Sequence, residues 1–212
     1  MSDTLVSPLE EAAAEGTAKR RQVMDGARAV FTKLGFDGAS MNDIARAAGV
    51  SKGTLYAYFE SKERLFEAMI REDRAQQAER LLDFSHDGDD VETLLTRFGN
   101  RFVTMVQRPE MLAQVRMVLA ACAKFPELGR AFFEAGPNYG ARRFAQELEK
   151  FTARGALKID DRLVAARHFL DMLHGGDMKA VMFCARGELT PFETEKVVAD
   201  ALRVFMAAYG PH

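Results

Sequence analysis

Apolar residues recur three and four positions apart along most of the chain, the spacing that gathers them on one face of an α-helix. Residues 18–35 and 191–209 follow this pattern, and 90–107 carries a stripe of Val91, Leu94, Leu95, Phe98, Phe102, Met105 and Val106. The sequence has no runs of alternating β-branched residues and no Asn-Gly turns, the features typical of strands and hairpins. We therefore expect an all-α fold of about nine helices without a sheet.

Start and stop signals give the expected helix boundaries. Side chains that can cap a helix N-terminus stand at Ser40, Ser51, Asp90 and Thr190. The expected helices are 18–35, 41–48, 51–58, 61–84, 90–107, 109–124, 126–154, 161–186 and 191–209. Pro137 lacks a backbone donor and should kink the helix 126–154. Gly175 and Gly176 lie in the middle of the helix 161–186.

Charge is distributed unevenly along the 212 residues. The whole chain carries a net charge of −2, whereas residues 19–66 hold nine basic and five acidic residues, a net of +4 that leaves −6 for the remainder. A basic N-terminal region beside an acidic one suggests nucleic acid as a partner. The hydrophobic content of 48% is enough for one sizeable domain or two smaller ones.

Several other classes of protein find no support in the sequence. Cys122 and Cys184 lie in apolar helical patterns, so we expect small buried side chains rather than a disulfide or a metal site. No apolar run reaches the length of a membrane span, and residues 1–17 are acidic and rich in small residues, which indicates a flexible arm rather than a signal peptide. We expect a cytoplasmic protein with no cofactor and no catalytic constellation.

The segment 49–66, GVSKGTLYAYFESKERLF, combines aromatic rings with hydroxyls and lysines. A short helix, a turn at Gly49 and a second helix from Ser51 form a helix-turn-helix pattern. The N-terminus of the second helix favours phosphate, and hydroxyl and ammonium groups bind the DNA backbone. Candidate contacts are Ser51, Lys52, Gly53, Thr54, Tyr56, Tyr58 and Lys62. The alternative is that Tyr56 or Tyr58 merely packs in the core, as Leu55 and Phe59 should.

The runs RRQVMDGARAVFTKLGFDGAS and SMNDIARAAGVSKGTLYAYFESKERLFEAMI, within about residues 18–70, resemble the DNA-binding signature of the TetR/AcrR family of regulators. The resemblance implies a flexible arm (1–17), a three-helix DNA-binding domain (18–66) and a helical regulatory and dimerisation domain (67–212). It places Ser51 to Thr54 in or beside the major groove, and Tyr56, Tyr58, Lys62 and also Ser40 on phosphates. Ala57 departs from the larger residue that many members have there.

A homodimer is the expected assembly, because the family pairs its last two helices with those of a second chain. Helix 191–209 has a wide apolar stripe. Two interior glycines, each of which costs ~1 kcal/mol against alanine, would be explained by a close helix crossing; packing within one chain is the alternative. The expected interface residues are Gly175, Gly176, Val198, Leu202 and Phe205.

A small, largely apolar effector is expected because 16 phenylalanines and 11 methionines suit an adaptable apolar pocket. Candidate lining residues are Phe102, Met105, Arg116, Met117, Phe133, Tyr139, Met172 and His174, with Asn100 and Asn138 as further polar groups. His168, Asp171 and His174 also follow a spacing that could suggest a metal, although an interface is the better interpretation without a second ligand cluster.

These features predict a dimeric repressor that binds an inverted-repeat site on double-stranded DNA. An effector among the helices 89–107, 109–124 and 161–186 would shift the far end of the helix 61–84 and move the DNA-binding domains. The alternative hypotheses are an architectural DNA-binding protein without an inducer and an enzyme on a helical bundle, for which the sequence offers no site.

Overall fold

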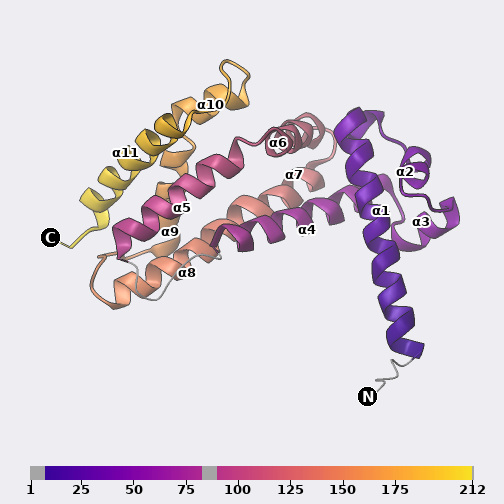
Figure 1. Ribbon diagram of the computed structural model, residues 1–212, viewed down its shortest axis with the longest axis horizontal. Coiled ribbons are helices and arrows are strands. Elements are labelled where there is room, and N and C mark those ends of the chain that lie inside the picture. Colours follow the sequence, from indigo (N-terminus) through magenta and orange to yellow (C-terminus); the bar gives the residue numbers. More distant parts are fainter. Residues whose placement is uncertain (1–7, 83–89, 212) are drawn as a thin grey trace, which may run out of the picture.

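The computed structural model describes residues 8–82 and 90–211 and is helical throughout, with no strand among those residues (Figure 1). The elements are α1 Pro8–Gly38, α2 Met41–Ala47, α3 Lys52–Tyr58, α4 Lys62–Leu82, α5 Val91–Val106, α6 Pro109–Cys122, α7 Pro126–Phe133, the π-helical turn η1 Glu134–Asn138, α8 Tyr139–Ala153, α9 Arg162–Leu173, α10 Gly176–Met182 and α11 Pro191–Tyr209. The prediction of an all-α fold is confirmed.

The predicted N-caps form. The side chains of Ser40, Ser51, Asp90 and Thr190 each accept a hydrogen bond from the backbone N–H three residues later. These bonds satisfy donors that the first turn of a helix leaves without a partner. Four helix starts are therefore determined by local sequence.

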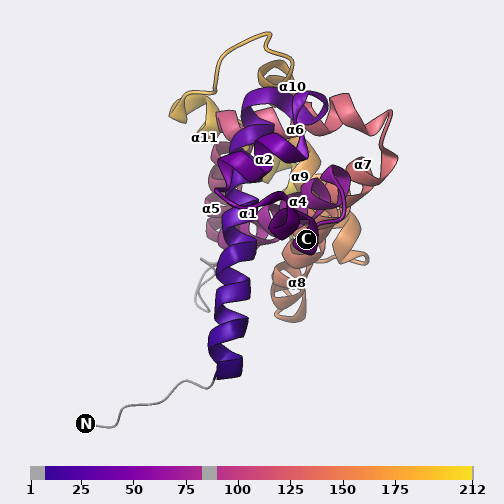
Figure 2. The same ribbon diagram turned by 90° about the vertical axis from the view of Figure 1, so that its right-hand side faces the viewer.

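The first helix differs from its prediction. It begins at Pro8 instead of residue 18, and Figure 2 shows its N-terminal part projecting away from the rest of the molecule. Residues 8–17 are therefore helical within the segment predicted as an arm, and residues 1–7 of that segment lie outside the described residues. At the other end Gly35 has φ 70°, so regular helical geometry does end where predicted, although the element continues to Gly38.

Two of the long predicted helices are interrupted. At Pro137 the chain forms the π-helical turn η1 between α7 and α8, which accommodates the missing backbone donor. The continuous helix predicted over 161–186 is wrong, because α9 ends at Leu173 and Gly175 forms the N-cap of α10. The two glycines thus lie at a helix junction, where a Cβ on Gly175 would come within 3.0 Å of the Met172 carbonyl oxygen and a Cβ on Gly176 would meet no described atom within 4 Å.

Two buried clusters divide the molecule. The head cluster joins α1, α2, α3 and the first half of α4, with Phe31, Phe36 and Phe66 in mutual ring contact. It also includes Val118 of α6 and Leu128 of α7. The head is therefore packed directly on α6 and α7, and the boundary expected at residue 66 does not interrupt the packing.

The body cluster fills the space between α5, α8, α9 and α11. The Phe98 and Phe144 rings stack with their centroids 4.1 Å apart, and Phe169 meets Phe205 edge to face at 5.3 Å. A Cβ added to Gly99 would lie 2.8 Å from a methyl carbon of Val198, so α5 and α11 approach closely there. This packing fixes which face of α11 points inward.

The two cysteines differ in their surroundings. Cys122 is half-buried near the end of α6, but Cys184 is exposed and has φ 58° in the turn after α10. The prediction of a buried Cys184 within a helix is therefore wrong, because α10 ends at Met182. None of the described helices is both long enough and apolar enough to span a membrane.

Candidate nucleic-acid interface

The turn between α2 and α3 has the geometry of a helix-turn-helix. Gly49 adopts φ 63°, and the Val50 N–H donates to the Ala45 carbonyl at 3.0 Å. The end of α2 is held against α1, because the Gln22 amide donates to the Ala48 carbonyl at 2.6 Å and a Cβ on Gly26 would come within 2.6 Å of Ala48. The turn is fixed on both sides, so α3 has a defined orientation on the head.

The first turn of α3 presents polar groups around a buried support. Leu55 is fully buried, whereas Lys52 and Gly53 are exposed and Thr54 is half-buried. The Ser51 Oγ accepts from the Thr54 N–H at 3.0 Å and lies 2.8 Å from the Thr54 hydroxyl. One apolar anchor thus leaves the N-terminal end of the helix open to solvent and able to meet an anion.

Tyr56 and Tyr58 are exposed, at 51% and 37% of their surface. Both rings therefore lie on the outer side of α3, where their hydroxyl groups can donate hydrogen bonds to a partner. The alternative that either ring packs in the core does not hold. A Cβ on Gly16 would lie 3.8 Å from the Tyr58 hydroxyl, so the N-terminal part of α1 borders the same surface.

Lys62 is the exception among the predicted contacts. Its ammonium donates to the carbonyl oxygens of Phe36 at 2.7 Å and Ala39 at 3.1 Å, and it lies 4.4 Å from the centre of the Phe36 ring. An ammonium has three donors, so at most one remains for a phosphate. Lys62 joins the start of α4 to the segment between α1 and α2, a structural role that the sequence did not predict.

Ser40 lies at the N-terminus of α2 and is exposed. Its hydroxyl accepts from the Asp43 N–H at 3.2 Å and contacts the Asp43 carboxylate. That carboxylate lies 3.4 Å from Arg46. A phosphate at this helix N-terminus would therefore meet a negative charge, which makes Ser40 a weaker candidate than Ser51.

Acidic residues of α4 neutralise part of the positive charge of the head. Arg20 pairs with Glu72 at 2.8 Å and Arg28 with Asp73 at 2.6 Å. The hydrogen bond to Asp73 is the main reason why the pKa of Arg28 is raised, burial acting in the opposite direction. Two of the nine basic residues thus hold the head on α4, and Lys52 is the exposed cation at the start of α3.

Models of known protein families match both halves of the chain. Residues 23–69 match the model described as bacterial regulatory proteins of the tetR family, and residues 93–211 match the C-terminal domain of AefR-like transcriptional repressors. The second match covers more than half of the chain. The protein belongs to the TetR family of transcriptional regulators.

Solved structures extend the likeness to nearly the whole chain. A TetR-family transcriptional regulator from Mesorhizobium loti is 30% identical, with a TM-score of 0.84, and the alignment covers 92% of this chain and 98% of that one. The flavonoid-responsive regulator FrrA is 33% identical, with a TM-score of 0.77, over 92% of this chain and 99% of that one.

Curated relatives match mainly in the head. The transcriptional repressor Rv1474c of Mycobacterium tuberculosis is 41% identical over 61 residues, which are 29% of this chain and 33% of that protein. The chain spans about one third of the length of the first curated relatives that it matches. YfiR, an HTH-type transcriptional regulator of Bacillus subtilis, is 25% identical over 78% of this chain and 81% of its own.

The residues predicted to line an effector pocket do not gather in one place. Phe102 is buried with its ring edge-on to His174, centroids 4.8 Å apart, and Met105 packs nearby on the body cluster. Met117 packs against the head cluster, and Phe133 is 53% exposed. The candidates therefore split between the interior of the body, its surface and the contact with the head.

The predicted polar candidates are mostly engaged within the chain. Arg116 is exposed and donates to the carbonyls of Val181 and Met182 at the end of α10, and the Tyr139 hydroxyl donates to Glu79. Asn138 is buried and bonds to Glu134 and Arg167. The remaining one, Asn100, is half-buried on α5.

The predicted dimer residues divide between core and surface. Val198 is 1% exposed and Phe205 is fully buried, so both pack mainly within the core of the subunit, and Phe205 reaches solvent space only at the floor of the groove described below. Leu202 is half-buried, Gly175 is half-buried and Gly176 is exposed. The apolar stripe of α11 was predicted correctly, but its inner part is covered by α5 and α9.

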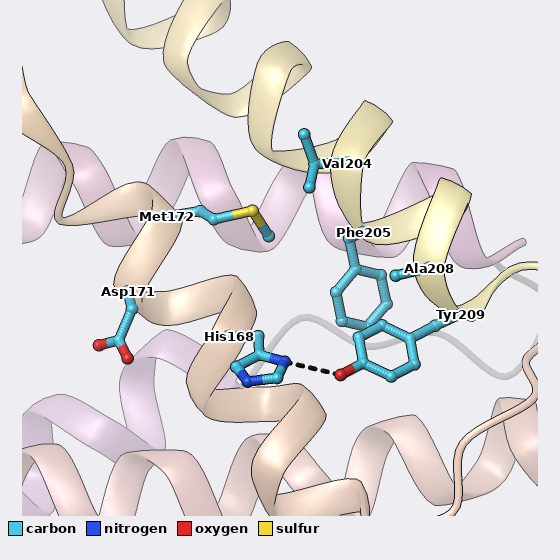
Figure 3. A pocket seen from close by; sticks show the side chains of 7 residues that line it. All are labelled: His168, Asp171, Met172, Val204, Phe205, Ala208 and Tyr209. Carbon is cyan, nitrogen blue, oxygen red and sulfur yellow. Dashed lines mark hydrogen bonds between the residues drawn. The ribbon is translucent and has the colours of Figure 1, made fainter.

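The outer face of α9 and α11 forms a groove of about 390 Å³, shown in Figure 3. It is lined by His168, Asp171, Met172, Val204, Phe205, Ala208 and Tyr209. Met172, a predicted effector contact, lies here and also borders a second groove with Gly175, Gly176 and Val197. This largely apolar face is the one on which a second subunit could pack.

His168, Asp171 and His174 do not converge. The His168 Nδ1 lies 2.6 Å from the Tyr209 hydroxyl, and the Asp171 carboxylate points away from it (Figure 3). His174 is directed inward against Phe102, and burial lowers the pKa of its imidazole. In the parts of the chain that the structure describes, no cluster of three metal-binding side chains forms.

Proposed function

We propose that the protein is a transcriptional repressor that binds an inverted-repeat DNA site as a homodimer. The observation that carries this proposal is the start of α3, where Lys52, Gly53, Tyr56 and Tyr58 are exposed around the buried Leu55. A capped helix N-terminus, a cation and hydroxyl groups together suit a phosphate backbone and the edge of a major groove. Residues 18–66 act as the DNA-binding unit in this proposal.

The dimer is proposed to form through the outer face of α9 and α11. The groove there is mainly apolar, and Val164 and Val204 on its two helices are 39% and 47% exposed. A twofold axis through this face makes each contact occur twice and sets one distance between the two heads. The DNA half-sites must then lie about one helical turn apart or somewhat more.

An effector bound by the body is proposed to release the DNA. Members of the family act as dimers on DNA, and FrrA, 33% identical, is named for its response to flavonoids. That name supports an aromatic, largely apolar effector for this chain. An effector that prefers the state unable to span both half-sites weakens DNA binding, and DNA weakens effector binding by the same factor.

The direct contact of α6 and α7 with the head gives a route for this coupling. Val118 and Leu128 lie in the head cluster, beside Phe36 and Phe66. A shift of α6 or α7 therefore reaches the head without first displacing the far end of α4. This route is proposed beside the predicted one, in which a shift at the far end of the helix 61–84 moves the head.

Selection of bound sequences from a random DNA pool tests the proposal. The expected result is a twofold-symmetric site that the dimer binds with strong salt dependence. Aromatic compounds are then screened for release of that site. Binding without sequence preference, unaffected by any compound, would favour an architectural protein, and no binding at all would remove the proposed function.

A further inference from the structure

Arg74 is a buried cation in the body. Its side chain is on α4, faces α6, α7 and η1, and the residue is only 6% exposed. Nη1 donates to the Gln77 amide oxygen at 3.1 Å and contacts the Met111 sulfur, and Nη2 donates to the Gln114 amide oxygen at 2.8 Å. The guanidinium carbon lies 4.2 Å from the centre of the Phe132 ring.

The partners of Arg74 are all neutral, and one of its donors is unsatisfied. Nε is buried with no hydrogen-bond partner. Among the described residues, no carboxylate lies within ion-pair distance of the guanidinium. The adjacent Asp73 is directed instead to Arg28, at 2.6 Å, and to the Gln114 amide, at 3.2 Å.

A buried charge without a counter-ion is unfavourable. Burial lowers the pKa of Arg74 to about 10, with the charge of Asp73 acting in the opposite direction, so the side chain stays protonated at neutral pH. Amide oxygens and an aromatic face offset only part of the loss of hydration. The residues one turn away on either side of Arg74, Ile70 and Ala78, are apolar and buried, so the charge stands on an otherwise apolar face of α4.

We propose that Arg74 binds the ionised group of the effector, which is then an aromatic or aliphatic acid rather than a neutral apolar molecule. The inference rests on the proposed function and narrows its ligand class. A carboxylate binds a guanidinium through two charge-assisted hydrogen bonds, which are stronger than those of an amide. It displaces the half-buried Gln77 and Gln114 side chains, and Phe132 and Met111 supply apolar contacts beside it.

The same side chains connect this site to the head. Gln114 of α6 bonds to both Arg74 and Asp73, and Asp73 pairs with Arg28 of α1. These four residues form a continuous polar chain from the buried cation to the first helix of the head. An anion that takes the place of Gln114 on Arg74 breaks the chain at α6, the helix that also packs against the head cluster.

Thermal unfolding with matched acid and amide probes tests the proposal. The probes are 3-phenylpropanoate and 3-phenylpropanamide, 1-naphthoate and 1-naphthamide, and octanoate and octanamide, at constant ionic strength. Binding to the folded state raises the midpoint by mass action. We expect at least one acid to stabilise the wild type while its amide binds tenfold or more weakly, and Arg74→Met to abolish the difference.

Arg71→Met is the matched control, because Arg71 is on the same helix but exposed and paired with Glu67; it should respond as the wild type does. Arg74→Lys keeps the charge and should retain part of the acid response. The proposal is wrong if no acid stabilises the wild type more than Arg74→Met, or if acid and amide act equally. It is also wrong if Arg74→Met and Arg74→Gln both fail to fold, because the guanidinium is then a structural requirement.

The assay contains no DNA, so failure of this inference can be told apart from failure of the proposed function. If the acids bind through Arg74 but no symmetric DNA site can be selected, the ligand class stands and the regulatory role fails. If DNA is bound and released by a neutral compound in Arg74→Met as in the wild type, the regulatory role stands and this inference fails.

Discussion

The head and the body expose their candidate residues in opposite ways. In α3 of the head, one buried residue, Leu55, supports a helix whose candidates face solvent, and Tyr56 is 51% exposed. In α11 of the body, Phe205 and Val198 are buried in the subunit, although they belong to the same kind of apolar stripe. The sequence of the short helix α3 offers one apolar face that can be buried. The 19-residue helix α11 is apolar over much of its circumference, so the helices packed against it determine which of its apolar residues are buried.

The largest expected effect tests the buried side of α11. Phe205→Ala removes a ring that contacts Phe169 and Tyr209 and should lower the free energy of unfolding by about 3–5 kcal/mol. Val204→Ala, one residue away and 47% exposed, should change subunit stability little and weaken the dimer instead. Chemical denaturation and light scattering separate the two effects. Equal destabilisation by both variants would contradict the assignment of the inner face.

The next prediction separates two lysines of the head. Lys62→Met loses two hydrogen bonds to backbone carbonyls and should destabilise the protein by about 1–3 kcal/mol. Lys52→Met removes an exposed cation, should leave the unfolding free energy unchanged, and should lower the slope of log affinity against log salt by about one unit. DNA titrations at several salt concentrations and urea unfolding measure these quantities. A lowered salt slope for Lys62→Met at unchanged stability would restore Lys62 as a phosphate contact.

The N-cap residues Ser51 and Thr190 allow a comparison in which each substitution is expected to lower the free energy of unfolding by about 1 kcal/mol. Each side chain accepts a backbone hydrogen bond, and Thr190 forms a reciprocal capping box with Glu193. Replacement of either by alanine should cost about 1 kcal/mol of stability, but only Ser51→Ala should also weaken DNA binding. Mobility shifts on a selected site measure the second effect. If Thr190→Ala weakened DNA binding as much as Ser51→Ala, the loss would reflect stability alone.

The smallest expected effect is a pH dependence in the body. Burial lowers the pKa of His174, with the Leu170 carbonyl acting in the opposite direction, so below about pH 6.5 the unfolded chain binds a proton that the folded one does not. Stability should therefore fall as the pH drops from 6.5 towards 5.5, and His174→Gln should reduce that loss. His168→Gln, on the outer face, is the control. A pH dependence unchanged in His174→Gln would show that its burial is not the cause.

Local sequence determined the elements that depend on neighbours a few residues away. Ser40, Ser51, Asp90 and Thr190 cap helices where predicted, because the donors that they satisfy lie within one turn. Pro137 interrupts its helix for an equally local reason, its missing N–H. The exposed face of α3 followed from the same short-range pattern.

Contacts between segments distant in the sequence were determined only by the tertiary structure. Lys62 of α4 donates hydrogen bonds to two carbonyls more than twenty residues earlier in the chain. Val198 and Phe205 of α11 are buried by other helices. The apolar pattern of α4 or α11 does not specify which helices pack against it, so neither result could be predicted from that pattern. The sequence contains one indication that Arg74 is unusual: it is a charged residue between Ile70 and Ala78 on an otherwise apolar stripe of its helix. That it is buried without a counter-ion depended on α6, α7 and η1, because hydration is lost only when other elements cover a side chain.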